Sequence, residues 1–259
     1  MINRSDPNDW RDLQTQTNQI LRECGFESEV EKNVETVRGT VNIDVYARDS
    51  SRIPSLVYLC ECKYWRSAVP QTVIHAFRTI VADYGANWGF IISTNGFQSG
   101  AFDAVKNSNV KLLTWGQFQE MFANLWYEKH LIPRLSEVAN PLIDYTEPIN
   151  GRVLRKADNL TEAGLERFKE LRQQYVDLAF SAIPFFMPQM NLDFLRGQSI
   201  TLRPSLPLRC SLKQSLPNEL VKLPDDLLDA SCLRDFLDIF CRHLESATEE
   251  FDQVFGERA

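Results

Sequence analysis

Residues 56–65 read LVYLCECKYW, and this run decides the fold. It is short and strongly apolar, which predicts a buried strand. Glu61 and Lys63 lie two positions apart, so their side chains leave the same face about 7 Å apart, at a rise of ~3.4 Å per residue. Cys60 and Cys62 alternate with them and are predicted to face the core. Because a buried charge is costly unless it is paired or bound to a metal, the Glu61 face needs a partner.

The preceding run TVNIDVYA, residues 40–47, supplies a candidate partner. Its alternation places Val41, Ile43 and Val45 on one face and Asp44 in the middle of the other. If the two strands are neighbours, Asp44 and Glu61 converge. Two carboxylates repel each other unless a divalent ion neutralises them, and oxygen ligands suit Mg²⁺. Lys63 could then orient or deprotonate an attacking water and offset the charge that develops on phosphorus.

A plainer interpretation of the same residues is a Glu–Lys pair at a strand end, with Asp44 in a turn. A Glu-x-Lys triplet is common by chance, so the order of the surrounding elements has to decide between the two. Helical spacing followed by Gly25 predicts a first helix, and three strand patterns then predict an antiparallel meander. After residue 65 helices and strands alternate, which implies a partly parallel sheet. Helices are predicted over 10–24, 70–86 and 116–135, and 94–108 is predicted to be a turn followed by a helix. The predicted strands are 27–34, 40–47, 56–64, 88–93 and 110–115.

The second half of the chain loses this alternation. NPLIDYTEPINGR, residues 140–152, carries two prolines and a glycine and is typical of a linker. Helical stripes predict helices over 161–183 and 229–255, while 190–228 is broken by prolines. We therefore expect two domains, an α/β domain over 1–138 and a mainly helical domain over 139–259.

Composition narrows the class of protein. The chain has 259 residues, of which 44% are hydrophobic and 24% charged, as in soluble globular proteins. It contains no apolar run of about 18 residues and no apolar segment at its start, so we expect no membrane helix and a cytoplasmic location with reduced cysteines. The net charge is −7, and acidic residues outnumber basic ones in both halves. This disfavours tight non-specific DNA binding without excluding a local basic groove.

Four short motifs together carry a family resemblance over roughly residues 8–125. The motifs CGF, GTVNID, ECK and STNGFQSGA, in this order, resemble those of Mrr-like restriction endonucleases of the PD-(D/E)xK nuclease superfamily. The resemblance implies a restriction-endonuclease-like α/β fold with a three-layer core, in which helices flank a mixed central sheet. It also implies that Asp44 and Glu61 bind Mg²⁺, which Mn²⁺ can replace, and that Lys63 is the catalytic lysine.

The resemblance extends to further site residues. Such nucleases often carry a glutamate in the first helix, and the matching position here is Gln14, which could hold a metal-bound water or a phosphate oxygen but brings no charge. Alternatively, Gln14 is a solvated helix residue. Gln71 at the start of the next helix could contact the substrate, or be an ordinary first-turn residue. Thr94, Asn95 and Gly96 could present backbone N–H groups to a phosphate, or simply cap a helix.

The function expected from these residues is a metal-dependent endonuclease that hydrolyses DNA, most readily double-stranded DNA, in restriction or anti-phage defence. One alternative is a catalytically silent nuclease-fold subunit that binds nucleic acid or protein. Another is a nuclease that acts on RNA or branched DNA. The helical half, with its strong Leu and Phe stripes, is expected to form homo-oligomers or to dock a protein partner.

Overall fold

The computed structural model describes residues 1–186, 203–210 and 223–256. Within them the chain separates into two compact units, Met1–His130 and Leu131–Ala259. The domain boundary expected after residue 138 falls inside helix α5 (Ile132–Thr146). Most of the weakly patterned region expected over 190–228 lies outside the described residues. The two units are described separately below.

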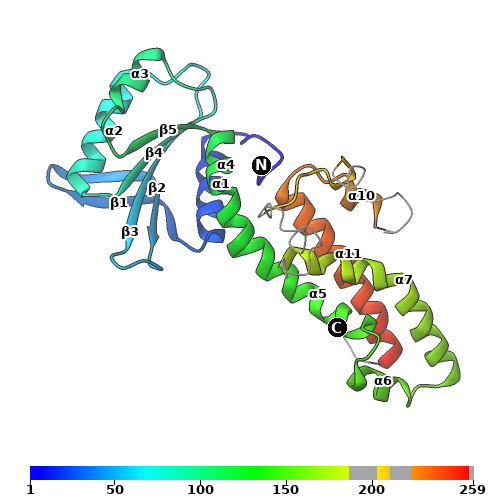
Figure 1. Cartoon of the computed structure of the whole chain (residues 1–259). Helices are drawn as coiled ribbons and strands as arrows, with labels where there is room; N and C mark the ends of the chain where they lie inside the picture. The colour runs from blue at the N-terminus through cyan, green and yellow to red at the C-terminus, as the bar shows by residue number, and fades with distance from the viewer. Residues whose placement is uncertain (187–202, 211–222, 257–259) are drawn as a thin grey trace, which may run out of the picture. The chain divides into compact units, whose positions relative to one another are not determined.

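The first unit is built on a five-stranded mixed sheet with the strand order β1-β2-β3-β4-β5 (Figure 1). The first three strands are antiparallel and the last three parallel, so the predicted meander and the partly parallel sheet are confirmed. Only two residues join β1 to β2, whereas helices connect the parallel strands, as parallel pairing requires. The strands are β1 (Glu27–Thr36), β2 (Gly39–Asp49), β3 (Leu56–Lys63), β4 (Trp88–Ser93) and β5 (Val110–Thr114).

Helices cover both faces of this sheet, which gives three layers (Figure 1). Helices α2 (Gln71–Tyr84) and α3 (Ser99–Ala104) lie on one face, and α1 (Trp10–Glu23) and α4 (Trp115–Trp126) lie on the other. The restriction-endonuclease-like three-layer core expected from the sequence is therefore confirmed.

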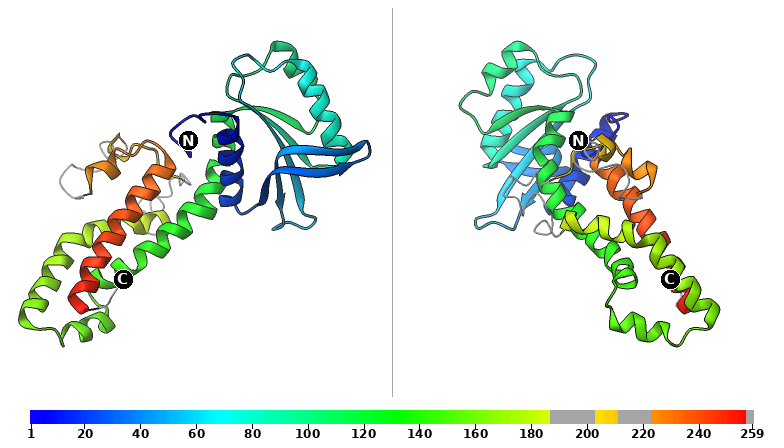
Figure 2. Two further views of the ribbon diagram at one scale, coloured as in Figure 1. Left: turned by 180° about the vertical axis from the view of Figure 1, so that it is seen from behind. Right: turned by 45° about the vertical axis from the view of Figure 1, so that its right-hand side comes forward.

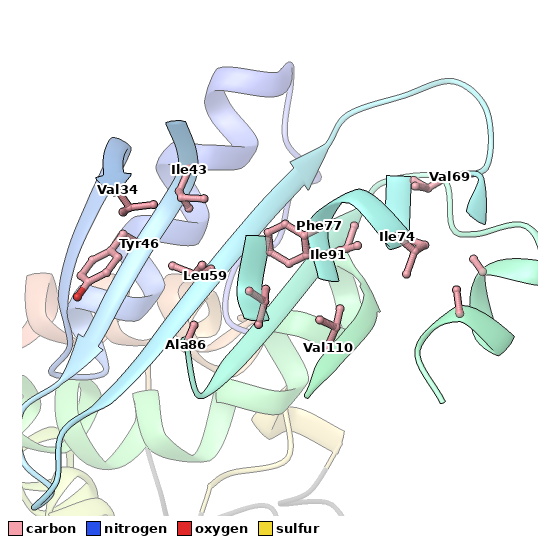
Figure 3. Close-up of a cluster of buried hydrophobic side chains, with 13 residues drawn as sticks. Val34, Ile43, Tyr46, Leu59, Val69, Ile74, Phe77, Ala86, Ile91 and Val110 are labelled. Atoms are coloured by element: carbon pink, nitrogen blue, oxygen red, sulfur yellow. The ribbon is translucent and has the colours of Figure 1, made fainter. Parts of the chain in front are cut away.

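The core beneath α2 is a continuous apolar cluster (Figure 3). Phe77 of α2 packs over Leu59 of β3 and Ile91 of β4, and all three are buried. A Cβ at Gly89 would lie 2.6 Å from the side chain of Val81, so α2 sits close against β4. This packing fixes the end of β3 that carries Glu61 and Lys63.

Helix α1 is held at both ends, and this determines where Gln14 lies. Asp9 caps the first turn by accepting a hydrogen bond from the Asp12 backbone N–H at 2.8 Å. Gly25 adopts φ +89°, and the Phe26 N–H returns to the Leu21 carbonyl, which ends the helix. The helix consequently turns Gln14 toward the sheet, where it is buried.

The second unit is helical, as expected. In both views of Figure 2 its three long helices run alongside one another, and they pack mutually. Tyr145 stacks on Phe251 with ring centroids 4.8 Å apart, and its hydroxyl donates to Asp252 at 2.6 Å. The helical elements that follow α4 are the π-helical turn η1 (Tyr127–Leu131), α5 (Ile132–Thr146), α6 (Gly151–Ala157), α7 (Glu162–Phe186), α10 (Asp225–Leu228) and α11 (Leu233–Phe255).

The linker predicted over 140–152 is wrong for its first half. Helix α5 continues to Thr146 and contains Pro141. A proline inside a helix costs about 3 kcal/mol, but the α5 face with Leu135, Leu142 and Tyr145 is buried and outweighs that cost. Among the described residues, no helix is both long enough and apolar enough to cross a bilayer.

Candidate active site

Asp44 and Glu61 lie where β2 and β3 part. The backbone pairing between the two strands runs as far as Val45 opposite Cys60, so Asp44 and Glu61 are the first residues beyond the paired region. Beyond this point the Cys62 N–H donates to the Asp44 side chain instead of to a backbone carbonyl of β2. The distance from the Cys62 nitrogen to Asp44 Oδ2 is 2.7 Å. The divergence therefore opens the sheet at the position of the two carboxylates.

Strand β1 is irregular at the residue opposite Asp44. Val30 pairs with Val45 and Lys32 with Ile43, so Glu31 lies opposite Asp44, and Glu31 has φ +53°. A positive φ at a non-glycine residue interrupts the regular strand geometry at this point.

The neighbours of Asp44 also depart from simple alternation. Ile43 and Tyr46 both join the core cluster of Figure 3, although simple alternation would place them on opposite faces. The prediction that Val41, Ile43 and Val45 share one face is wrong here, because Val41 and Ile43 pack with this cluster whereas Val45 is buried outside it.

Gln14 reaches the same point from α1. Its side chain is only 7% exposed, and its Nε2 donates to Asp44 Oδ1 at 2.9 Å. Both oxygens of Asp44 thus accept a hydrogen bond, one from the Gln14 amide and one from the Cys62 backbone. This fixes the orientation of the carboxylate and excludes the alternative that Gln14 is a solvated helix residue.

Lys63 forms an ion pair with Glu61 within the strand. The two side chains are 16% and 22% exposed, so the pair is largely shielded from solvent. Lys63 Nζ also lies 5.5 Å from the centroid of the Trp65 ring, a cation–π distance. Of the candidate residues, Gln14, Asp44, Glu61 and Lys63 are therefore brought together.

The charge state of Glu61 reflects this setting. Burial and the nearby Asp44 charge raise the pKa of Glu61 above its ordinary value of 4.5, while Lys63 acts to lower it. The carboxyl group thus holds its proton more firmly than a solvated glutamate does. A cation that binds Glu61 competes with that proton.

Affinity for a divalent ion is therefore expected to fall as the pH drops toward the raised pKa of Glu61. Titration calorimetry with Mn²⁺ between about pH 5 and about pH 8 measures this dependence. Glu61→Gln removes the titrating group, so we expect that variant to bind more weakly and with a flatter pH profile. An equally steep profile in Glu61→Gln would assign the titration to another group.

The donor set fits a hard divalent ion. Among the residues that the structure describes, no three His, Cys, Asp or Glu side chains gather into a metal site. Asp44 and Glu61 offer two carboxylates, the number that Mg²⁺ takes when water and substrate phosphate complete its shell. Cys60 and Cys62 are buried, as predicted, and burial raises the pKa of both thiols.

Gln71 contacts residues outside this group. It is the first residue of α2, and its Nε2 is 3.1 Å from the His75 Nε2. Its side-chain oxygen would lie 3.1 Å from a Cβ built at Gly100 of α3. A substrate contact by Gln71 stays a prediction.

The Thr94–Gly96 loop is arranged differently from a helix cap. Helix α3 begins only at Ser99, and Gln98 stands at its N-cap position. The Thr94 N–H donates to the Lys63 carbonyl at 3.2 Å, and the Asn95 N–H donates to Ser93 Oγ at 3.2 Å. These two amides are used inside the protein, so a substrate contact by the backbone N–H of Thr94 or Asn95 is not supported, and the Gly96 N–H stays a candidate.

The sequence interpretation missed an open groove beside Lys63. Its cavity volume is about 500 Å³, and it is lined by residues that include Tyr64, Trp65, Arg66, Thr94, Asn95 and Trp115. Tyr64 and Trp65 directly follow Lys63 in the chain. The sequence signal that could have indicated the groove is the pair Tyr64 and Trp65, two aromatic residues at the start of a polar loop.

An Asp on one strand and a Glu-x-Lys on the next, at the opening of a mixed three-layer sheet, define the PD-(D/E)xK class of nuclease fold. Residues 6–122 match the family model Mrr_cat, described as "Restriction endonuclease". This match agrees with the resemblance to Mrr-like restriction endonucleases that the four motifs indicated.

Other comparisons add little. A solved structure titled "Crystal Structure of Protein of Unknown Function AF1548" is similar at 21% identity and a TM-score of 0.35. The match covers 40% of this chain and 59% of that one. No curated protein matches the sequence.

Proposed function

We propose that this protein is a metal-dependent endonuclease that hydrolyses phosphodiester bonds in double-stranded DNA. The observation that carries the proposal is the meeting of Asp44, Glu61 and Lys63 at the parting of β2 and β3, inside a restriction-endonuclease domain. A role in restriction of foreign DNA in the cytoplasm follows from the same family.

The proposed roles follow from chemistry and position. Asp44 and Glu61 would hold Mg²⁺, with Mn²⁺ as a substitute, and the bound ion would supply Lewis-acid polarisation of the phosphate and a more acidic water. Gln14 and the Cys62 N–H keep the Asp44 carboxylate in a fixed orientation. Lys63 Nζ would hold the attacking water by a hydrogen bond and place a positive charge near the phosphate.

Cleavage of plasmid DNA tests the proposal. Supercoiled and linear plasmids are incubated with the full chain in Mg²⁺, in Mn²⁺ and in excess EDTA. We expect nicks and breaks in either metal and none in EDTA, with a 5′-phosphate at each new end. Cleavage that persists in EDTA would rule out the metal mechanism.

Gln14 favours a second candidate, a silent nuclease-fold subunit that binds nucleic acid or protein. The amide donates to an oxygen of Asp44 that a metal would need, and it contributes no charge of its own. In this second candidate, the hydrogen bonds from Gln14 and from the Cys62 backbone occupy both oxygens of Asp44, so neither is free for a metal ion. An inactive wild type that still binds DNA would favour it.

Gln14→Glu separates these possibilities. We expect it to lower the stability of the metal-free protein by about 1–3 kcal/mol, because a hydrogen bond to Asp44 is replaced by repulsion between carboxylates. Mn²⁺ should then raise the melting temperature of the variant more than that of wild type, since three carboxylates attract the ion. Thermal unfolding with and without Mn²⁺ measures both effects.

Gln14→Ala is the matched control, because it removes the hydrogen bond without adding charge. It should lose stability but show no larger response to Mn²⁺ than wild type. An unchanged Mn²⁺ response in Gln14→Glu would mean that the ion does not bind near Asp44.

The helical unit is proposed to mediate assembly, either with a second copy or with a partner protein. Its acidic and aromatic composition supports a protein contact rather than a DNA contact. Sedimentation of the full chain at micromolar concentration, together with a pull-down, tests this. A monomer that recovers no partner would count against it.

A further inference from the structure

The groove beside Lys63 has a lining that suits one kind of ligand. It is formed by the loop after β3, the loop after β4, the start of α4 and the segment around Asp6. All of these belong to the first unit. Trp65 joins the groove to the candidate active site, since Lys63 Nζ lies over its ring.

Aromatic faces are presented at the mouth of this groove. Tyr64 and Trp65 are each 40% exposed, although large rings are usually buried. Exposed rings next to a phosphate-processing site are suited to stacking on nucleobases, which all have a π-face.

The charges of the groove favour a base over a phosphate. Arg66 brings one positive charge and Asp6 one negative charge, so the lining has no net positive charge to hold an anion. The Asp6 carboxylate would repel a phosphate, but it can accept a hydrogen bond from a base amino group. The Asn95 amide and Thr94 hydroxyl add polar groups of the kind that base edges bind.

The groove is already formed in the free protein. Asn95 Nδ2 donates to the Arg66 carbonyl, and the Val69 N–H donates to the Gly96 carbonyl at 3.0 Å. These bonds tie the loop after β3 to the loop after β4. A ligand therefore does not have to order the loops, which lowers the cost of binding.

Trp115 belongs to the groove lining, and its ring is buried behind it. Its ring is 3% exposed and stacks on Phe118, and its indole N–H has no hydrogen-bond partner among the residues described. Buried donors are normally paired, so one left open calls for an explanation. This N–H has no exposed surface, so contacts with a ligand in the groove fall to Tyr64, Trp65 and the polar loop residues.

We propose that this groove binds an unpaired nucleobase next to the phosphate at Lys63, stacked on Trp65. In an intact duplex both faces of a base are covered by its neighbours, so only a single-stranded or extruded base can enter. The protein would therefore prefer DNA with unpaired nucleotides near the cleavage point. The inference rests on the proposed nuclease function, because it places a strand at Lys63.

Binding of a fluorescent base tests the groove without any cleavage. The full chain is titrated in Ca²⁺ with a single strand carrying 2-aminopurine, and with the same strand in a duplex. We expect tighter binding and stronger quenching for the single strand. Trp65→Ala should weaken single-strand binding about tenfold, as loss of one base–aromatic stack does. Duplex binding should not change, and Trp65→Phe should recover most of the loss.

Two controls make the result specific. Trp88→Ala removes a tryptophan at the start of β4, the end of the strand away from Lys63, and should leave single-strand binding unchanged. A strand with abasic sites should bind as weakly to wild type as the normal strand binds to Trp65→Ala. Equal binding of abasic and normal strands, or no effect of Trp65→Ala, would overturn the inference.

The failures of the two proposals can be told apart. If the protein cleaves DNA but binds single strands independently of Trp65, only the groove is wrong. If binding depends on Trp65 but no DNA is cleaved in Mg²⁺ or Mn²⁺, the groove stands and the nuclease proposal fails.

Discussion

Lys63→Ala is expected to abolish cleavage of supercoiled plasmid while leaving DNA binding intact. Lys63 lies beside Glu61 and is proposed to hold the attacking water. Its loss should lower the cleavage rate by about 10²–10⁴-fold, which is the usual contribution of a general acid–base group. Gel analysis of plasmid nicking in Mg²⁺ measures the rate, and fluorescence anisotropy in Ca²⁺ measures binding.

The control for this variant is Lys106→Ala. Lys106 is exposed and pairs only on the surface with Asp103, so removing it should leave cleavage unchanged. Melting curves check that Lys63→Ala is folded, since it leaves Glu61 without its ion-pair partner. A folded Lys63→Ala protein that nicks DNA at the wild-type rate would remove Lys63 from the mechanism.

Asp44→Asn is expected to lose both divalent-ion binding and cleavage while keeping its fold. An asparagine can still accept the Cys62 N–H, and its amide can donate to Gln14 once the Gln14 amide turns over. The hydrogen bonds survive but the charge is gone. Calorimetry with Mn²⁺ and plasmid nicking should both fall to background, with a melting temperature close to that of wild type.

Asp44→Ala removes the hydrogen bonds of Asp44 as well as its charge. The Cys62 N–H and the Gln14 amide lose their acceptor in this variant. We expect a loss of stability of about 1–3 kcal/mol for each buried group left unpaired. Asp103→Asn, at an exposed position, is the matched control and should change nothing. Normal Mn²⁺ binding by folded Asp44→Asn would show that the ion is held elsewhere.

Much of the first unit was predictable from the sequence because local signals agreed with the fold. The alternation of Cys60 and Cys62 with Glu61 and Lys63 set the two faces of β3, and both cysteines are buried. The change of period after residue 65 marked the start of the parallel strands. Gly25, with φ +89°, ended α1 where expected.

The features that the sequence did not predict depend on long-range contacts. The Gln14–Asp44 hydrogen bond joins residues 30 positions apart, so no local pattern contains it. The kink at Glu31 depends on the partner strand. Pro141 suggested a break, yet burial of one face of α5 outweighs the local preference of proline.

The groove was missed for a related reason. Tyr64 and Trp65 are visible in the sequence as aromatic residues after Lys63, but the other wall comes from residues 94–95 and 114–116. Only the packing of β3, β4 and α4 brings these segments together.

The central claim is that the opening between β2 and β3 holds a divalent ion beside Lys63. Anomalous diffraction from crystals of the protein grown with Mn²⁺ tests it most directly. We predict an anomalous peak between the carboxylates of Asp44 and Glu61, at about 2.0–2.2 Å from their oxygens. A protein that cleaves DNA in Mn²⁺ but shows no peak at these carboxylates would contradict the claim.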